Sequence, residues 1–261
     1  MLITGAGGGF GRQMVRQFRD AGAKLVLTDI DADALQLAID DAGNDLVVSI
    51  IADLSSEEGC DVLVETCMSS GVVPDILVNN AGIALAGRMD HVPREHWESL
   101  VQLNLLAPMR LCGRFLPALV ERRSGHVVNI SSIAGWTGAE GLSSYCASKF
   151  GLRGFGMSLA ADLRGTGVHV TNVYPCFSRT PILDSPQHGY AERRVVPDYL
   201  ISDPAHVVAR ILDGVRRNSL HVFPDKYARL IHYLARYAPW ALPLLDRRIQ
   251  GWSRVARKAA G

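Results

Sequence analysis

The sequence predicts an α/β fold in which helices cover both faces of a parallel, doubly wound sheet. Short apolar runs rich in Val, Ile and Leu alternate along the chain with longer stretches of helical periodicity. The apolar runs show little polar alternation, as expected for strands buried on both faces. The 261 residues, 48% of them apolar, suit one large domain with a sizeable core.

The elements follow one another in the order that such a sheet requires. Strands are expected at residues 2–4, 24–28, 46–50, 76–79, 126–130, 169–174 and 221–223. Helices are expected between them at residues 11–21, 32–42, 57–70, 94–121 and 144–165. Because the first strand has almost no length, either it is truncated or the natural start of the chain lies upstream.

A glycine-rich segment, Thr4-Gly-Ala-Gly-Gly-Gly-Phe-Gly11, lies between the first expected strand and the first expected helix. Glycines at such a turn let the main chain approach a pyrophosphate, which then rests on the helix N-terminus. The spacing differs from the commonest dinucleotide fingerprint, and a simple tight turn is the alternative. The segment predicts a Rossmann-like dinucleotide site built from Gly5, Gly9, Phe10 and Gly11.

Acidic residues end the second and third expected strands. Asp29 lies 18 residues after Gly11, where a carboxylate accepts both hydroxyls of an adenosine ribose and repels a 2′-phosphate. No Arg or Lys precedes Gly9 in the loop, so NAD is favoured over NADP. Asp53 is expected to accept a hydrogen bond from the adenine amino group. The alternative is that each caps the helix after it, with Asp31 as the competing cap for the first helix.

The chain resembles the short-chain dehydrogenase/reductase family from about Leu2 to Phe223. The resemblance is carried, in family-like order, by the glycine loop, Asn79-Asn-Ala-Gly82, Asn104, Ser132 and Tyr145-Cys-Ala-Ser-Lys149. It implies nicotinamide-dependent oxidoreduction with Asn104, Ser132, Tyr145 and Lys149 as catalytic residues. It also implies cofactor contacts from Ile30, Leu54, Asn80, Ala81, Gly82, Tyr145, Lys149, Pro175, Ser178 and Thr180.

One departure from the family pattern is Cys176, which stands where the family has glycine after proline. Cysteine does not reach glycine-only dihedral angles cheaply, so the path of this loop is in question. The thiol could lie near the nicotinamide, but packing is the expected role of Cys176.

The spacing of Tyr145 and Lys149 places both side chains on one face of a helix. A nearby ammonium favours a phenolate, so we expect Lys149 to lower the pKa of Tyr145 from its ordinary value of ~10. Tyr145 would then be the base in alcohol oxidation and the acid in ketone reduction. The 13-residue interval before Tyr145 selects Ser132 over Ser131 to bind the substrate oxygen. The resemblance implies that Lys149 binds the nicotinamide ribose and that Asn104 holds a water linking Lys149 to solvent.

The substrate is expected to be a hydrophobic secondary alcohol or ketone of lipid, steroid or terpenoid type. The residues expected around it are mostly apolar, namely Ile83, Leu85, Trp136, Leu183 and Tyr190. A 3-oxoacyl-thioester reductase using NADPH is the runner-up, and Asp29 counts against it. A dinucleotide-binding sensor or scaffold without turnover is a different class, and the complete catalytic set counts against it.

Composition argues against several other classes of protein. The formal net charge of +1 gives no electrostatic case for a nucleic-acid partner. The five cysteines are scattered and never in Cys-x-x-Cys spacing, and the eight histidines show no ligand spacing, so no metal site is expected. Reduced thiols in a cytoplasmic protein are the expected state. No signal peptide is visible, and no apolar run reaches the roughly 18 residues of a membrane span.

The C-terminal part of the chain differs from the rest in composition and in the spacing of its apolar residues. Residues 1–225 are expected to form the dinucleotide-binding catalytic domain, including a substrate lid at residues 177–204 with a short helix near 191–194. Residues 226–261 are expected to form a basic helical extension, with helical apolar spacing at Tyr227, Leu230, Ile231 and Leu234 and a second pattern at Leu245, Ile249, Trp252 and Val255. The extension is expected to pack on the domain or on a sister subunit, with peripheral membrane contact as the alternative. The family implies a dimer or tetramer formed through the long helices at residues 94–121 and 144–165.

Overall fold

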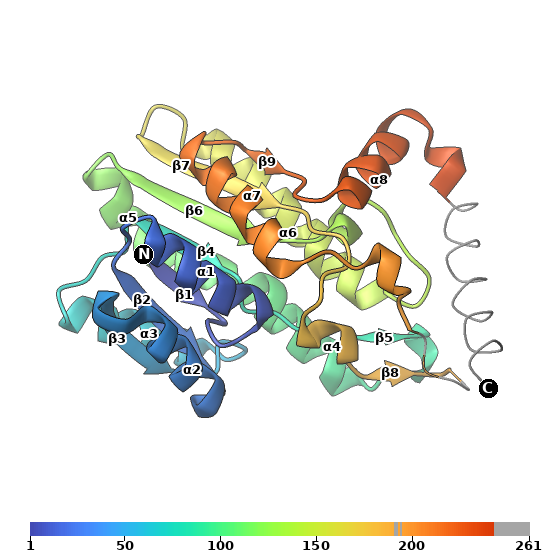
Figure 1. The fold of residues 1–261 in the computed structure, drawn as a ribbon, viewed down its shortest axis with the longest axis horizontal. Helices are drawn as coiled ribbons and strands as arrows, with labels where there is room; N and C mark the ends of the chain where they lie inside the picture. Colours follow the sequence, from blue (N-terminus) through green and yellow to red (C-terminus); the bar gives the residue numbers. More distant parts are fainter. Residues whose placement is uncertain (191–192, 194, 243–261) are drawn as a thin grey trace.

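The computed structural model describes residues 1–190, 193 and 195–242. Its main element is a seven-stranded sheet, parallel throughout, in the order β3-β2-β1-β4-β6-β7-β9 (Figure 1). The strands are β1 Leu2–Thr4, β2 Leu25–Asp29, β3 Leu46–Ile51, β4 Ile76–Asn79, β6 Gly125–Ile130, β7 Val168–Val173 and β9 His221–Val222. The predicted Rossmann-like, doubly wound α/β fold is confirmed.

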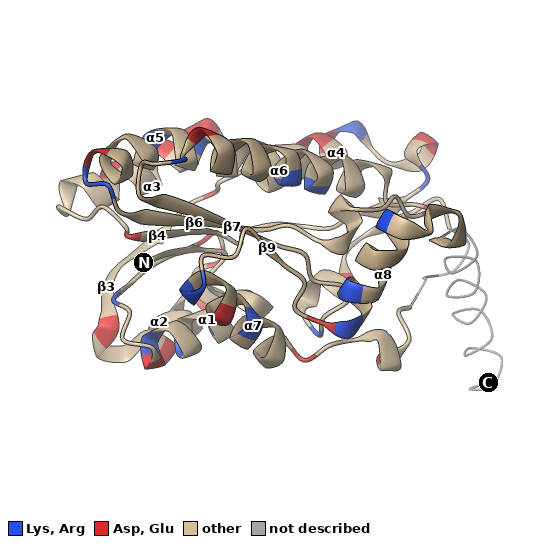
Figure 2. Ribbon diagram, turned by 90° about the horizontal axis from the view of Figure 1, so that it is seen from above, with Lys and Arg blue, Asp and Glu red and all other residues tan. Residues whose placement is uncertain are grey.

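Helices cover both faces of the sheet, as Figure 2 shows in edge view. One core contains apolar residues from α1 (Gly9–Asp20), α2 (Ala32–Ala42) and α7 (Pro204–Arg216). The other contains residues from α3 (Glu57–Ser69), α5 (Ala107–Glu121) and α6 (Ser143–Asp162). Apolar side chains are therefore buried on both sides of the strands, which explains the absence of polar alternation in their sequences.

Helix α7 was not predicted, although its sequence carries a helix start signal. Asp203 caps the helix by accepting a hydrogen bond from the Ala205 N–H at 2.9 Å, and Pro204 occupies the first turn. This order of an acidic cap followed by proline is typical of helix N-termini.

The helix predicted at residues 94–121 is interrupted near its middle. It consists of α4 (Arg94–Val101), a π-helical turn (Gln102–Leu106) and α5. π-helical turns have no simple sequence signature and often occur at functional sites. This one buries Asn104.

Among the described residues, the segment Arg94–Glu121 is long and apolar enough, by length and composition, to span a membrane. It is not the uninterrupted apolar run that the sequence was found to lack, because Arg110 and Arg114 lie within it. Core helices pass the same test, and α5 packs against α3 inside the second core.

The order of the strands reverses beside β1, which pairs with β2 on one side and β4 on the other. Ligands of such sheets bind in the crevice outside the carboxyl ends of the strands at this switch point. The glycine loop follows β1 at that end. A separate two-stranded sheet, β5 (Ala86–Gly87) with β8 (Gln187–His188), joins the segment after β4 to the predicted lid.

The predicted helix in the C-terminal extension is present as α8 (Lys226–Tyr237). The second apolar pattern, at Leu245, Ile249, Trp252 and Val255, and most of the short helix expected near residues 191–194 lie outside the described residues. The division into a domain at 1–225 and an extension at 226–261 stays a prediction.

Candidate active site

The glycine loop is braced by the loop after β4. Gly5 has a φ of +62°, and a Cβ there would lie 2.9 Å from the Ala81 Cα. A Cβ on Gly11 would lie 2.1 Å from the Gly5 carbonyl oxygen. The Asn80 side-chain amide donates hydrogen bonds to the carbonyls of Thr4 and Gly5, at 2.8 and 3.0 Å. Only glycine fits these two positions, so the predicted loop path is explained by the close approach of main chains.

Asp29 and Asp53 both lie at the carboxyl edge of the sheet, and neither caps a helix. Asp31 caps α2 by accepting from the N–H groups of Asp33 and Ala34. Ser56 caps α3, so the capping alternatives for Asp29 and Asp53 are wrong.

The Asp29 carboxylate is directed at the glycine loop, where it accepts a hydrogen bond from the Gly7 N–H at 2.9 Å. The Asp53 carboxylate accepts from the Ser55 N–H at 2.9 Å. Ile30 is 63% exposed, whereas Leu54 is buried. Asp29 therefore lies beside the loop that would hold a pyrophosphate, at the place predicted for a ribose partner.

The segment after β7 brings Ser178 and Thr180 to the same crevice. Thr180 lies against the glycine loop, because a Cβ on Gly9 would be 2.5 Å from its Cγ2. The Ser178 hydroxyl is buried and has no hydrogen-bond partner among the described residues. A buried hydroxyl of this kind needs a partner. The orphan hydroxyl and the glycine cradle both fit a nicotinamide dinucleotide, and contact of Ser178 with its carboxamide stays a prediction.

Tyr145 and Lys149 project from one face of α6, as predicted. The Lys149 Nζ lies 5.7 Å from the centre of the Tyr145 ring and donates a hydrogen bond to the Ile130 carbonyl at 3.0 Å. Ser132 and Tyr145 line the same cavity, and the Ser132 hydroxyl favours ionisation of the Tyr145 phenol. The Ser132 Oγ accepts a hydrogen bond from the Ala134 N–H at 3.1 Å. The Ser131 hydroxyl instead donates to the Lys149 carbonyl at 3.0 Å. Ser132, not Ser131, is thus the serine beside the tyrosine.

Asn104 holds the loop that passes over Lys149. Its side-chain oxygen accepts from the Ile83 N–H, and its nitrogen donates to the Ile83 carbonyl, each at 2.9 Å. A Cβ on Gly82 would lie 2.9 Å from the Asn104 oxygen and 3.6 Å from the Lys149 Nζ. The π-helical turn therefore serves to seat this loop, and the water link to Lys149 stays a prediction.

The pKa of Tyr145 differs from the sequence-based expectation. Burial raises it to about 12, opposed by the nearby Ser132 hydroxyl. Burial also lowers the pKa of Lys149 to about 8. The prediction that Lys149 lowers the pKa of Tyr145 below ~10 is wrong for this structure, because burial removes water from the phenolate and raises the pKa of the phenol. At neutral pH the phenol is protonated, as an acid must be.

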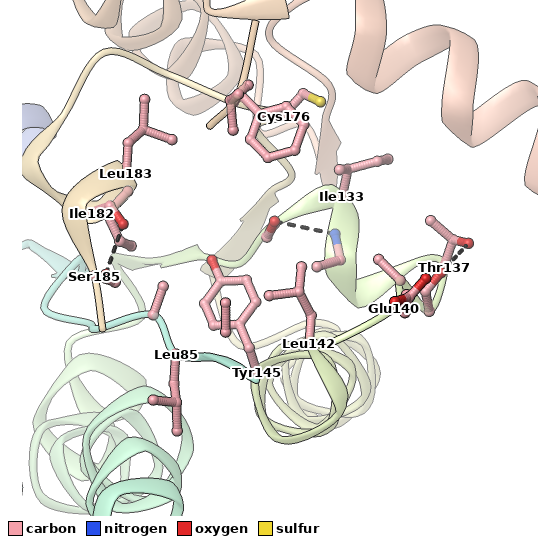
Figure 3. A pocket seen from close by; sticks show the side chains of 18 of the residues that line it. Leu85, Ile133, Thr137, Glu140, Leu142, Tyr145, Cys176, Ile182, Leu183 and Ser185 are labelled. Atoms are coloured by element: carbon pink, nitrogen blue, oxygen red, sulfur yellow. Dashed lines mark hydrogen bonds between the residues drawn. The ribbon is translucent and has the colours of Figure 1, made fainter. Parts of the chain in front are cut away.

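A cavity of about 650 Å³ opens in front of the Tyr145 phenol. Figure 3 shows the phenol directed into it, with Leu85, Leu142 and Ile182 around it and Ile133 and Cys176 across the space. The predicted residues Leu85, Leu183 and Tyr190 line this cavity. Its lining is mostly apolar and includes Ser132 and Ser178. The cavity therefore joins the catalytic residues to a hydrophobic space.

Trp136 and Ile83 do not line the cavity, contrary to expectation. The Arg153 guanidinium carbon lies 3.4 Å from the centre of the Trp136 ring, and the His232 ring lies 4.4 Å from it. The indole is thus held in a cluster of aromatic rings behind the catalytic loop. The Trp136 ring also contacts the rings of Tyr174 and Phe223, so residues distant in sequence decide its orientation.

The C-terminal extension supplies cavity residues that the sequence did not reveal. Ile231, Pro239 and Leu242 line the cavity together with residues of the lid, such as Leu183 and Pro197. The extension is joined to the active site through Asp225, which caps α8 by accepting from the Ala228 N–H at 2.8 Å. The helical spacing predicted the helix but could not tell which surface it covers.

Asp225 also accepts a hydrogen bond from the Cys176 N–H at 2.9 Å. Among the described non-glycine residues only Arg123 and Asn218 have positive φ, so Cys176 needs no glycine-like geometry. Burial raises the pKa of its thiol to about 12, so the thiol stays protonated, in keeping with a packing role. All five cysteines are free, and the described residues contain no group of three metal-ligating side chains.

Hydrogen bonds among three buried asparagines near the site were also not foreseen, although Asn79 belongs to a motif that the sequence showed. Asn79, Asn129 and Asn172 lie in register on β4, β6 and β7. The Asn79 side chain donates to Asn129 at 2.9 Å, and Asn129 donates to Asn172 at 3.0 Å. This ladder of hydrogen bonds ties β4, β6 and β7 together near their carboxyl ends. The sequences of the three strands do not show that these asparagines pair.

A dinucleotide crevice beside a Ser–Tyr–Lys set is the arrangement of a nicotinamide-dependent oxidoreductase. The family model described as short chain dehydrogenase matches residues 1–190. The chain belongs to the short-chain dehydrogenase/reductase family and is an oxidoreductase. Epidermal retinol dehydrogenase 2 of Mus musculus is 34% identical over 92% of this chain and 78% of its own length.

Solved structures of the family hold either cofactor. The 3-ketoacyl-(acyl-carrier-protein) reductase of Brucella melitensis, complexed with NADH, is 26% identical with a TM-score of 0.74, covering 84% of this chain and 90% of that one. A short-chain dehydrogenase of Sphingobium yanoikuyae, in complex with NADPH, is 27% identical with a TM-score of 0.74, covering 96% and 93%. Family membership therefore leaves the choice between NAD and NADP to the residues of this chain.

Proposed function

We propose that this enzyme transfers a hydride between NAD(H) and a hydrophobic secondary alcohol or ketone, with Tyr145 as the proton carrier. The observation that carries the proposal is the phenol of Tyr145, directed into a mostly apolar cavity that Ser132 also lines. A bound nicotinamide would supply hydride transfer at the carbinol or carbonyl carbon.

The residues of the chain have distinct parts in this reaction. Ser132 would donate a hydrogen bond to the substrate oxygen and orient it as charge develops. Tyr145 would give its proton to that oxygen in reduction and take it in oxidation. Lys149, with Nζ at 5.7 Å from the ring centre, would stabilise negative charge on the phenol oxygen and hold the ribose. Ser178 would bind the carboxamide and fix the ring to one face of the cavity.

The apolar cavity supports a hydrophobic substrate. Its volume of about 650 Å³ lies in the range of sites for drug-sized ligands. The similar mouse protein is named for retinol, a hydrophobic alcohol, although a primary one. Screening hydrophobic secondary alcohols with NAD, beside short polar alcohols, tests this choice. Faster turnover of the polar series would contradict it.

A 3-oxoacyl-thioester reductase remains the second candidate, because the Brucella relative of that name was solved with NADH. Its cofactor therefore no longer separates the two activities as clearly as the sequence suggested. Acetoacetyl thioesters in the same screen decide between them, since the proposal requires higher kcat/KM for a hydrophobic ketone without a thioester.

The preference for NAD is predicted to depend on Asp29. The wild-type protein is expected to bind NADH at least about tenfold more tightly than NADPH, because a carboxylate beside the 2′-phosphate costs ~1 kcal/mol or more. Asp29→Ala is expected to weaken NADH binding and narrow this ratio about tenfold, measured by fluorescence titration. Asp31→Asn is the matched control, because Asn also caps helices. Equal or tighter binding of NADPH by the wild type would overturn the assignment.

We also propose that the enzyme is a dimer or tetramer assembled through the long helices. Met109 of α5 and Phe150 and Met157 of α6 are about two-fifths exposed on the face of the sheet that these helices cover. Phe150→Glu is expected to halve the mass measured by light scattering. Leu37→Glu, on α2 across the sheet, is the control and should leave the mass unchanged. An unchanged mass for Phe150→Glu would place the interface elsewhere.

A further inference from the structure

Exposed apolar side chains gather around the mouth of the cavity. On α8 and the turn at Pro239–Ala241, the most exposed large apolar side chains are Leu230, Tyr233, Tyr237 and Trp240. Tyr237 and Trp240 have 71% and 73% of their surface exposed. Val195 and Tyr199 of the lid are more than half exposed as well. These six residues, here called the mouth patch, adjoin the cavity residues Ile231, Pro197 and Pro239.

The helix that carries most of the mouth patch is fixed to the domain. Its first turn is capped by the buried Asp225, and the His232 ring stacks on Phe223 with the centroids 4.1 Å apart. The Tyr227 hydroxyl donates to the Tyr199 carbonyl at 2.6 Å, which ties the helix to the lid. With one face held by these contacts, α8 presents Tyr233 and Tyr237 outward.

The charge of α8 has a single sign. Within Lys226–Tyr237 the helix carries Lys226, Arg229 and Arg236 and no Asp or Glu (Figure 2). An amphipathic helix with aromatic residues on one side and cations beside them is typical of helices that lie in the interface of a bilayer. Tyr and Trp prefer that interface, and Lys and Arg are attracted to anionic lipid.

We propose that the mouth patch rests on an anionic lipid bilayer, so that the cavity opens toward the membrane. A cytoplasmic enzyme would meet such lipid on the inner leaflet of a membrane. A second copy of the chain is a poorer occupant, because a two-fold axis through α8 would bring its cations against the same cations. The vesicle binding is independent of the proposed function; only the passage of a hydrophobic alcohol from the bilayer into the cavity rests on it.

Co-sedimentation of the full-length protein with vesicles tests the proposal. Vesicles of phosphatidylcholine with phosphatidylserine are expected to bind at least about tenfold more protein than phosphatidylcholine alone, because about three cations act together. Tyr237→Ser/Trp240→Ser is expected to weaken binding to both vesicles about tenfold or more. Arg229→Glu/Arg236→Glu is expected to remove the dependence on phosphatidylserine.

Matched controls change similar residues elsewhere on the surface. Leu37→Ser/Val62→Ser and Arg164→Glu/Arg216→Glu replace exposed apolar and basic side chains away from the mouth and should bind like the wild type. Wild-type protein that ignores phosphatidylserine, or controls that lose as much binding as the patch variants, would overturn the proposal. So would a patch variant that lowers the mass of the protein in solution, because this identifies a second copy as the occupant.

Activity separates this proposal from the proposed function. With a short water-soluble secondary alcohol, the patch variants are expected to keep wild-type kcat/KM. With a long-chain alcohol supplied in vesicles, they are expected to lose rate in proportion to lost binding. Vesicle binding without any secondary-alcohol oxidation would refute the proposed function alone, whereas turnover without vesicle binding would refute the membrane surface alone.

Discussion

Replacing Tyr145 with phenylalanine is expected to lower kcat by about a thousandfold in both directions of the reaction. The substitution keeps the ring and removes only the hydroxyl that faces the cavity. Positioned acid–base groups contribute roughly 10²- to 10⁴-fold to a rate, which sets the size of the effect. Binding of NADH, followed by its fluorescence, should change by less than about threefold, since the loss is confined to the chemical step.

A tyrosine in the same cavity provides the control for this variant. Tyr190→Phe removes another cavity hydroxyl and is expected to change kcat by less than about tenfold. Residual activity of Tyr145→Phe at the level of Tyr190→Phe would remove Tyr145 as the proton carrier. If instead no variant and no wild-type preparation turned over any alcohol while NADH still bound, the chain would be a dinucleotide sensor.

The pH dependence of the wild type follows from the same group. Because the pKa of Tyr145 is about 12, the phenolate needed for oxidation is a small fraction at neutral pH and grows about tenfold per pH unit. The kcat/KM for oxidation should therefore rise with pH, whereas that for reduction stays level until the pH nears the pKa. If kcat/KM for oxidation no longer rises with pH in Tyr145→Phe, the pH dependence of the wild type is assigned to the phenol of Tyr145.

Replacing Lys149 with methionine is expected to abolish most activity and yet stabilise the fold. The lysine pKa of about 8 lies below its value of 10.5 in an unfolded chain, so at lower pH the folded state bears a cost for the buried charge. The shift corresponds to about 3 kcal/mol, reduced by ~1 kcal/mol for the lost hydrogen bond to the Ile130 carbonyl. A net gain of about 2 kcal/mol is expected below pH 8.

The sign of this effect makes it easy to recognise. Between pH 8 and 10.5 the lysine is protonated in the unfolded chain but not in the folded one, which lowers the free energy of unfolding of the wild type. The gain in stability from Lys149→Met is therefore complete below pH 8 and vanishes above pH 10.5. Urea unfolding across this range measures it. Lys24→Met, at an exposed lysine paired with Asp45, is the control and should show no such gain. If Lys149→Met were less stable than the wild type at neutral pH, the claim that the buried Lys149 ammonium destabilises the folded state would be contradicted.

Most of the sheet could be predicted because its strands are apolar runs buried on both faces, a pattern that depends on local sequence. The exceptions are elements whose cause is not local. The pairing of Ala86–Gly87 with Gln187–His188 joins strands of two residues that have no periodicity to detect. The π-helical turn at Asn104 keeps the apolar spacing of an ordinary helix, so its extra width left no mark on the pattern.

The proposed catalytic residues could be brought together from the sequence because their spacing along the chain places them near one another. Their environment could not be predicted in this way. Distance along a helix places Tyr145 near Lys149, but the pKa of the phenol depends on how many distant segments exclude water from it. Trp136 was assigned to the wrong surface for the same reason, since Arg153 and His232 hold it from behind. The Asp29 carboxylate was placed correctly because a strand end has only one edge to occupy.

The carboxylate of Asp225 bonds both to the start of α8 and to the segment after β7. Without it, substitutions could alter these two parts of the molecule independently. One oxygen caps the helix α8, which lines the cavity, and the other accepts a hydrogen bond from the Cys176 main chain, two residues before Ser178, the residue proposed to bind the carboxamide. A tilt of α8 that admitted a bulkier alcohol would pull on the nicotinamide side of the crevice. Selection for new substrates is therefore expected to act on the lid first, where side chains change without disturbing the grip on the cofactor.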